Sequence, residues 1–499
     1  MNLLLNRLVN TGVILVTLLF SVNTWAAKWI DVGDLHLRSS IQLLADAGLI
    51  TVPVNTYPLM WSGVMSDLNK HQNDPLEGVV KQSFEQVMQA YQLSHGKSRT
   101  QITASAANEP SRFQHFEDSP RNKSQITLSH EGETEHFSYK LSANVQSADN
   151  YGDSVASLDN SYISGFLGNW ALTLGSYQQW HGPGWDADLI RSNNARPMPS
   201  VFITRDKSEE IDFPILRWLG PWAFTTGVSW MNDERAVDNT LLWSMRLTFK
   251  PIHNLEIGAS RASQLCGNGR PCGAETWKNM LIGKDNAGRD GLTAEQEPGN
   301  GLAAVDARWG DIAFDIPYGI YWQSMGEDAV RLDRFPPFQA KSYLYGADIS
   351  YQAFGQYIRT YVEYSNSQPT CGGIDGNCAY EHHIYQSGYR YNQRSVGSTY
   401  DNDARTYTLG FVGNNESEHQ WQMNLRYLEL NRDNSNRSGY AGNRVTEIAE
   451  NASQLEGIYQ WPIFIGTMKV GLVYTYSTFD NDIDTKSDID AWMKWNYEF

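Results

Sequence analysis

The sequence predicts a mainly β protein: a transmembrane antiparallel β-barrel of about 18 strands, preceded by a small helical domain. Three observations predict this class. Apolar and polar residues alternate over long runs, aromatic side chains recur near the ends of those runs, and the chain ends on such a run. Strands of about 9–11 residues with one apolar and one polar face suit a barrel with lipid outside and a polar lumen inside. A soluble β-sandwich or propeller also alternates and is the alternative class.

Composition and charge exclude some roles. The 499 residues include 56 Asp and Glu against 39 Lys and Arg, for a net charge of −17. An acidic chain is a poor candidate for nucleic acid, whose phosphates need a basic surface. The mean hydropathy is −0.47, and no apolar run of about 18 residues follows the N-terminal region, so a helical membrane protein is not expected.

Residues 1–26 have the features of a secretory signal peptide. Arg7 precedes an apolar run from Val13 to Phe20, and Thr24-Trp25-Ala26 places small residues at the two cleavage positions. We expect cleavage after Ala26 and export to an oxidising compartment. An uncleaved anchor is the alternative, but the apolar run is short for spanning a bilayer.

Residues 27–98 are expected to form a small helical domain. Asp34 is placed to cap a helix whose apolar stripe ends at Gly48. Asp74-Pro75-Leu76-Glu77 offers a second helix start: a capping residue, Pro at the first position, and Glu placed to return a hydrogen bond to the cap. The expected structure is a packed pair of helices.

From about residue 99 to residue 499 the period changes from helical to two. In His136–Gln146, the odd positions from 137 are apolar and the even positions are polar. The last run, Asp488–Phe499, alternates without a break and ends on Trp495, Tyr497 and Phe499, which resembles the C-terminal signal that the barrel-insertion machinery reads. Strands are expected near 100–107, 124–130, 136–147, 160–167, 170–178, 211–218, 221–231, 240–250, 253–263, 300–308, 312–325, 344–353, 356–366, 403–413, 418–431, 452–461, 464–478 and 488–499.

Short turns alternate with long loops between these strands. In bacterial barrels the short turns lie on the periplasmic side and the long loops lie outside. An even number of strands leaves both ends of the barrel domain on the periplasmic side, so the helical domain is expected there too. Both cysteine pairs and the segment Trp180–Pro199 then fall in outward loops.

The four cysteines form two close pairs, Cys266 with Cys272 and Cys371 with Cys378, and each pair encloses Gly-rich sequence. Two local disulfides are expected, because each closes a small loop at low entropic cost. A zinc site of four thiolates is the alternative. Its paired spacings are normally shorter, and these pairs lie far apart in the sequence.

The segment Trp180–Pro199 is long and irregular within a regular scaffold, which is typical of a functional loop or of a structural plug. Trp rings offer flat apolar faces for sugars, and Asp and Asn offer planar hydrogen-bonding groups. Arg can pair with acidic sugars. The alternative is a loop that folds into the lumen, with its Arg residues paired to lumenal carboxylates. The candidate polysaccharide-binding residues are Trp180, His181, Trp185, Asp186, Asp188, Arg191, Asn193, Asn194 and Arg196.

Two groups of residues are candidates for an enzyme site: His181 with Asp186 and Asp188, and the pair His382-His383. Neither lies near a recognisable nucleophile motif, and the chain has no G-x-S-x-G. We therefore expect no catalytic residues, no cofactor and no metal site.

Five stretches of the chain are long, irregular and ordered along the helical domain and the first half of the barrel. They are LRSSIQLLADAGLI (37–50), YPLMW (57–61), WHGPGWDADLIRSNNARPMP (180–199), LRWLGPW (216–222) and LEIGASRASQLCGNGRP (255–271). With these stretches the chain resembles the capsule assembly Wzi family, and after about residue 300 only the pattern matches. Family members often have an aromatic residue where this chain has His181.

The resemblance implies an 18-stranded barrel in the outer membrane of a Gram-negative cell, a periplasmic helical bundle, and lectin-like attachment of capsular polysaccharide. The expected partners are capsular or extracellular polysaccharide, outer-membrane lipid and the barrel-assembly machinery, with the protein itself a monomer. The alternative function is a porin or a polysaccharide export channel, since barrels of about 16–18 strands can be open.

Overall fold

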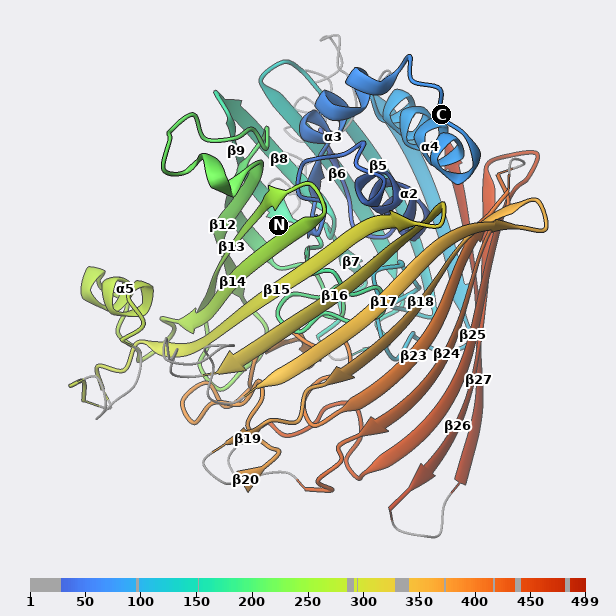
Figure 1. Ribbon diagram of the computed structural model, residues 1–499. Helices are drawn as coiled ribbons and strands as arrows, with labels where there is room; N and C mark the ends of the chain where they lie inside the picture. Colours follow the sequence, from blue (N-terminus) through green and yellow to red (C-terminus); the bar gives the residue numbers. More distant parts are fainter. Residues whose placement is uncertain are drawn as a thin grey trace, which may run out of the picture.

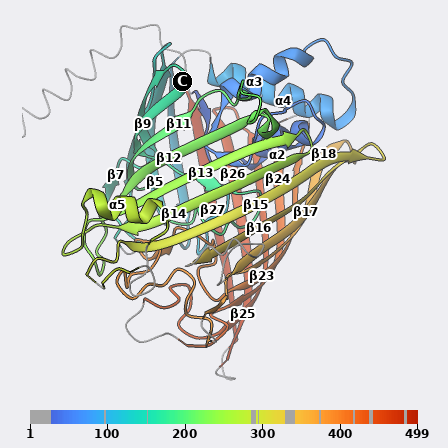
Figure 2. The same ribbon diagram turned by 60° about the vertical axis from the view of Figure 1, so that its left-hand side comes forward.

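The structure is a computed structural model that describes residues 28–95, 98–150, 152–284, 291–293, 295–327, 341–371, 374–415, 418–435, 441–480 and 485–499. The predicted signal peptide, residues 1–26, lies outside the described residues. A closed β-barrel dominates the molecule (Figure 1). The helices that precede the barrel in the sequence gather at one end, called the helical end here (Figure 1). The longer loops, one of which carries a further short helix, lie mostly at the opposite or loop end, as the turned view also shows (Figure 2).

The helical end contains α2 (Leu35–Asp46), α3 (Trp61–Leu68) and α4 (Gly78–Ser94), with the short elements β1 (Trp29–Ile30), β2 (Thr56–Tyr57), β3 (Leu59–Met60) and η2 (Asn69–His71). The predicted cap of α2 is confirmed: the Asp34 side chain accepts a hydrogen bond from the backbone N–H of Leu37 at 2.9 Å. None of the described helices is long and apolar enough to cross a membrane.

The predicted capping box at Asp74–Glu77 is wrong. Helix α4 begins only at Gly78, and Glu77 precedes it without a side-chain capping hydrogen bond. The Asp74 carboxylate lies 2.7 Å from Nδ1 of His71 instead, so a local contact with the preceding turn takes the place of the cap.

The barrel is antiparallel, closed and built from 18 long strands, as predicted. The circle closes where β27 pairs with β4, from Trp492 opposite Ala107 to Glu498 opposite Gln101. The strands are β4 (Arg99–Ala107), β5 (Ser124–Glu133), β6 (Phe137–Gln146), β8 (Ser161–Leu167), β9 (Trp170–Ser176), β11 (Pro199–Arg205), β12 (Trp222–Met231), β13 (Thr240–Ile252), β14 (Leu255–Leu265), β15 (Gly299–Ala313), β16 (Ile316–Glu327), β17 (Ser342–Ala353), β18 (Gln356–Asn366), β23 (Arg405–Asn414), β24 (Gln420–Leu430), β25 (Glu450–Pro462), β26 (Thr467–Phe479) and β27 (Thr485–Glu498).

Short elements decorate the connections between these strands. Strand β7 (Ala156–Ser157) extends the barrel beside β6. The others are β10 (Trp180–His181), η3 (Arg217–Leu219), α5 (Ala274–Leu281), β19 (Thr370–Cys371), β20 (Ile374–Asp375), β21 (Arg390–Tyr391) and β22 (Arg394–Ser395).

One predicted strand is wrong. Residues 211–218 are not in the sheet; they belong to the connection between β11 and β12 and lead into η3. Pro214 interrupts this run, and proline cannot donate to a sheet ladder. The missing strand is β11, which pairs with β9 and with β12. Its Phe202 is fully buried on the lumenal side, which breaks the polar-inside pattern that the prediction followed.

Burial is inverted relative to a soluble protein. On β6, Phe137, Leu141 and Val145 are about half exposed on the outer face, whereas Ser138 and Ser142 are buried toward the lumen. The main apolar cluster lies inside the barrel, where the helical end meets the inward-folded segment around Trp180. An apolar belt outside and a filled, mostly polar lumen inside are typical of a membrane-spanning barrel.

Candidate functional site

The connection between β9 and β11, residues 177–198, folds into the barrel and is called the plug here. All of its residues from 179 to 198 are buried except Arg196, which is partly exposed. Strand β10 at its start pairs with β2 of the helical end, Trp180 opposite Tyr57 and His181 opposite Thr56. The plug therefore connects the loop end to the helical end through the lumen.

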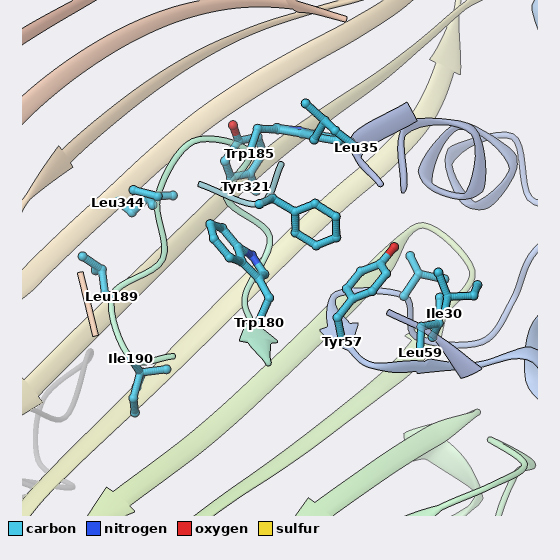
Figure 3. Packing of buried hydrophobic residues seen from close by; sticks show 14 of the residues in the cluster. Ile30, Leu35, Tyr57, Leu59, Trp180, Trp185, Leu189, Ile190, Tyr321 and Leu344 are labelled. Atoms are coloured by element: carbon cyan, nitrogen blue, oxygen red, sulfur yellow. The ribbon is translucent and has the colours of Figure 1, made fainter. Parts of the chain in front are cut away.

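The two tryptophans of the plug face protein rather than solvent. Trp180 and Trp185 lie among Leu35, Tyr57 and Tyr321 (Figure 3). The guanidinium of Arg38, from α2, lies 4.6 Å from the Trp185 ring centre and 5.5 Å from that of Trp180. Their flat faces are therefore already covered by side chains in this conformation.

Backbone amides of the plug converge on one carboxylate. Glu363, on β18, accepts hydrogen bonds from the N–H groups of Trp185 at 2.7 Å, Asp186 at 3.2 Å and Ala187 at 2.8 Å. The indole N–H of Trp185 donates to Asp348 on β17 at 3.1 Å. The barrel wall thus satisfies backbone N–H groups of the plug that are buried away from solvent.

Two predicted sugar-binding carboxylates also hold the plug in place. Asp186 accepts from Nε of Arg426 at 2.8 Å and from Thr408 at 2.9 Å. Burial alone would raise the pKa of Asp186, but Arg426 and His115 outweigh it and hold the pKa at about 2. Asp188 accepts from the N–H groups of Ile190 and Arg191, both at 2.8 Å, and burial raises its pKa to about 7.

The remaining predicted residues make similar contacts. Burial, together with Arg246 and Arg191, lowers the pKa of His181 well below its ordinary value, so this ring is neutral. Burial lowers the pKa of Arg191, and the neighbouring Tyr389 and Tyr177 partly offset this effect. Asn193 donates to the backbone oxygen of His115 at 3.1 Å, and Asn194 accepts from the N–H of Gln114 at 3.2 Å. The structure brings the predicted set together as a packed plug.

Arg196 differs from the predicted residues described so far, because it is partly exposed and borders a cavity. Its guanidinium pairs with Asp153 at 2.8 Å and with Asp159 at 2.9 Å. The cavity, of about 190 Å³, lies between the plug and the wall formed by β4, β5 and β6. Its lining is almost entirely polar and includes Arg121, Asn122, Gln125, Asn144 and Gln146 toward the loop end. We call it the outer cavity.

A second polar cavity, of about 330 Å³, adjoins the outer cavity toward the helical end. The two share lining residues, including Gln101, Lys140 and Lys494, so they follow one wall of the lumen. Asn193 is the predicted residue that lines this inner cavity. Lys140 and Lys494 fall on the polar faces of their strands, so the alternation of residues predicts that both side chains face the lumen.

The positive side chains in and beside the outer cavity have different partners. Lys140 pairs with Asp31 at 2.7 Å and Lys494 with Asp118 at 2.6 Å. Within the described part of the chain, Arg121 and Arg394 form no salt bridge. The Arg121 guanidinium donates to the backbone oxygen of Asn194 at 2.8 Å and to that of Asn193, and Arg394 donates to the backbone oxygen of Ser111 at 2.7 Å.

Arg121 and Arg394 are electrostatic neighbours. Burial, and then the charge of Arg394, lowers the pKa of Arg121 to about 9, and burial lowers that of Arg394 to about 10. Nη1 of Arg394 is buried and has no hydrogen-bond partner among the described residues. Both side chains stay charged at neutral pH, so an anionic group beside them would be stabilised. We call them the arginine pair. They lie in connections between the long barrel strands, where no long alternating run of residues points to them.

The first predicted disulfide is confirmed. Cys266 and Cys272 are bonded at the start of the β14–β15 connection, with an S–S distance of 1.94 Å. The second predicted pair, Cys371 with Cys378, involves the side chain of Cys371, which lies outside the described part of the structure.

Comparisons with known proteins agree with this architecture. An uncharacterised 55.8 kDa protein in the cps region of Klebsiella pneumoniae is 30% identical over 308 residues. That match covers 60% of this chain and 59% of the relative, so it spans less than two thirds of either. The solved structure of Escherichia coli Wzi matches with a TM-score of 0.79 at 23% identity, over 94% of this chain and 99% of the other.

The Escherichia coli protein is described as an outer membrane protein involved in group 1 capsule assembly and as a carbohydrate-binding β-barrel. At 23% identity the likeness shows a shared fold. The family model of the capsule assembly protein Wzi matches residues 93–490, which is most of the chain and almost the whole barrel. The chain therefore belongs to the capsule assembly protein Wzi family.

Proposed function

We propose that this protein binds capsular or extracellular polysaccharide and anchors it at the cell surface during capsule assembly. Membership of the Wzi family over residues 93–490 carries the proposal. The description of Escherichia coli Wzi as a carbohydrate-binding barrel supports it. We assign no catalysis to the protein, because the carboxylates of the plug are engaged in holding the plug itself.

The proposed location is the outer membrane of a Gram-negative cell. A signal peptide, cleaved after Ala26, directs export of the protein. The barrel-assembly machinery then inserts the protein into the outer membrane as a monomer. Residues 27–98 then form a periplasmic domain, and residues 99–499 form the barrel. The outward-facing apolar side chains support contact with lipid. The helical end faces the periplasm in this arrangement, and the loop end faces the medium.

We place the glycan contact at the loop end, around the outer cavity and the arginine pair. Amide and hydroxyl groups line this region, which suits sugar hydroxyls. The arginine pair suits the carboxylate of an acidic sugar, because guanidinium groups grip carboxylates through paired hydrogen bonds. Of the predicted residues, Arg196 and Asn193 border these cavities, and the others act by shaping the plug that forms one side of them.

The test measures where the polysaccharide goes. A strain that lacks the protein is complemented with the wild type, with Arg121→Ala, with Arg394→Ala, or with Arg217→Ala. Arg217 is an exposed arginine in the β11–β12 connection at the helical end and serves as the matched control. Cell-bound and released polymer are then measured separately, and barrel folding is checked by heat-modifiable migration.

Anchoring predicts that total polymer is unchanged while the bound fraction falls in the deletion strain and in both arginine-pair variants, but not in Arg217→Ala. A fall of bound and released polymer together would instead assign the protein to export or synthesis. No change in the deletion strain would contradict anchoring, and conductance of the purified protein in a bilayer would then test the porin alternative.

A further inference from the structure

Two connections at the loop end bring a glutamate and two histidines together. Glu297 lies just before β15, in the connection that carries α5 and the Cys266–Cys272 disulfide. His382 and His383 lie in the β18–β23 connection. Nε2 of His382 lies 3.5 Å from Oε1 of Glu297, and Nε2 of His383 lies 3.4 Å from the same oxygen. One nitrogen or oxygen atom from each residue lies within 4.8 Å of the others.

The two histidine–glutamate separations are close to the edge length of a zinc coordination sphere. Ligand atoms about 2.0–2.1 Å from a tetrahedral zinc ion lie about 3.3 Å from one another. Two imidazoles and one carboxylate are also a donor set that zinc uses when a fourth position holds water. We propose that Glu297, His382 and His383 form a binding site for a divalent transition-metal ion, zinc fitting best, that clips the two connections together.

The surroundings of the cluster position its ligands. Arg270, inside the disulfide loop, donates to the backbone oxygen of Glu297 at 2.6 Å. The hydroxyl of Tyr385 donates to the backbone oxygen of Cys266 at 3.0 Å, which holds the histidine segment against the same loop. The Cys266–Cys272 disulfide therefore organises both sides of the site, as outer contacts do in metal sites.

Burial leaves one side of the site open. The Glu297 side chain is 5% exposed and that of His382 is 13% exposed, whereas that of His383 is 58% exposed. A metal ion held from the protein side would thus keep an accessible position toward the medium. With a divalent ion bound, the site carries a net charge of +1. The two imidazoles are neutral, and the carboxylate of Glu297 compensates only one of the two charges of the ion.

Two hydrogen bonds to His382 disfavour binding of a metal ion. Nδ1 of His382 lies 3.2 Å and 3.4 Å from the backbone nitrogens of Ile384 and Tyr385, whose N–H groups donate to it. Zinc bound at Nε2 puts the ring proton on Nδ1, so these two long hydrogen bonds are lost on binding. The alternative is that protonated histidines simply pair with Glu297, without a metal, and the experiment is designed to separate the two.

The test uses full-length protein purified in detergent and stripped with a chelator. Zinc alone is added in competition with a chromophoric chelator, and cobalt is added separately to record its visible spectrum. The variants are His383→Ala, which removes an exposed side chain, and Glu297→Gln, which keeps the shape of the carboxylate. His253→Ala, an exposed histidine at the helical end, is the matched control. Heat-modifiable migration confirms that each barrel is folded.

The expected result is one zinc ion per chain, a tetrahedral cobalt spectrum, and a loss of affinity greater than about tenfold in His383→Ala and in Glu297→Gln. The control keeps the wild-type affinity. Zinc also slows proteolysis of residues 266–298 and 367–404 in the wild type but not in His383→Ala. Equal affinity in the wild type and in the two site variants, or no zinc binding by the wild type, would overturn the proposal in favour of plain ion pairs.

Discussion

Removing the Glu363 carboxylate tests whether the barrel wall holds the plug. Glu363→Ala leaves the N–H groups of Trp185, Asp186 and Ala187 without their acceptor. Each buried, unsatisfied donor costs about 1–3 kcal/mol. The sum is about 3–9 kcal/mol, and water that enters the space left by the side chain moves the cost toward the lower end. A loss of about 3 kcal/mol raises the population of released plug about 100-fold.

Limited trypsin digestion of the folded protein in detergent measures this population. Arg191 is the trypsin cleavage site within the plug and is buried in the native plug, whereas the Arg196–Pro197 bond resists trypsin because proline follows the arginine. We expect Glu363→Ala to be cut there much faster than the wild type while the barrel keeps its heat-modifiable migration. Glu109→Ala is the control, because that carboxylate is 59% exposed and pairs with Lys123 at the surface. Equal cleavage of Glu363→Ala and the control would refute the reasoning.

Further predictions concern the plug, the disulfide and the C-terminus. Trp185→Ala removes a buried ring and should destabilise the plug by about 3–5 kcal/mol, measured by the same digestion. The low pKa of Asp186 contributes stability that is present above pH about 4, the ordinary carboxyl pKa, and is lost as pH falls toward 2. Tryptophan fluorescence should therefore change over that window in the wild type and much less in Asp186→Asn. Cys266→Ser should cost about 2 kcal/mol locally, seen as faster proteolysis of residues 266–298 with unchanged barrel migration. Deleting Phe499, which stacks on Tyr497 with ring centres 5.8 Å apart, should lower the yield of inserted barrel in cells without lowering the stability of the barrel that forms.

The barrel strands were predictable because the pattern that identifies them lies within each strand. A lipid-facing residue alternates with a lumen-facing one along each strand, and this pattern located all the long strands but one. It failed where the lumen is apolar. Phe202 on β11 packs inward with Tyr177, while 211–218 carries apolar residues that stay outside the sheet. Alternation reports the polarity of each face, so a strand next to an apolar part of the lumen gives the wrong signal.

For the plug, the sequence predicted two alternative roles and did not decide between them. Its composition suggested either sugar binding or packing into the lumen, and the partners that decide its position are remote in sequence. Asp186 meets Arg426 across 240 residues, and Trp185 meets Glu363 across 178. The arginine pair and the Glu297 cluster also arise from loops that fold toward one another. Such contacts follow from the closed shape of the barrel and have no spacing that a single sequence displays.

The pairing of β10 with β2 constrains the order in which the chain can assemble. Strand β2, from the helical end, and strand β10, from the plug, pair inside the barrel. The pairing of β27 with β4 closes that barrel. The buried bonds of the plug reach strands as late as β24, so they cannot form before most of the wall is present. Threading the plug into a finished ring would strip many polar groups of water at once. Folding therefore favours a route in which the plug enters the lumen before β27 pairs with β4. The final β27–β4 pairing then closes the barrel around a plug that is already packed.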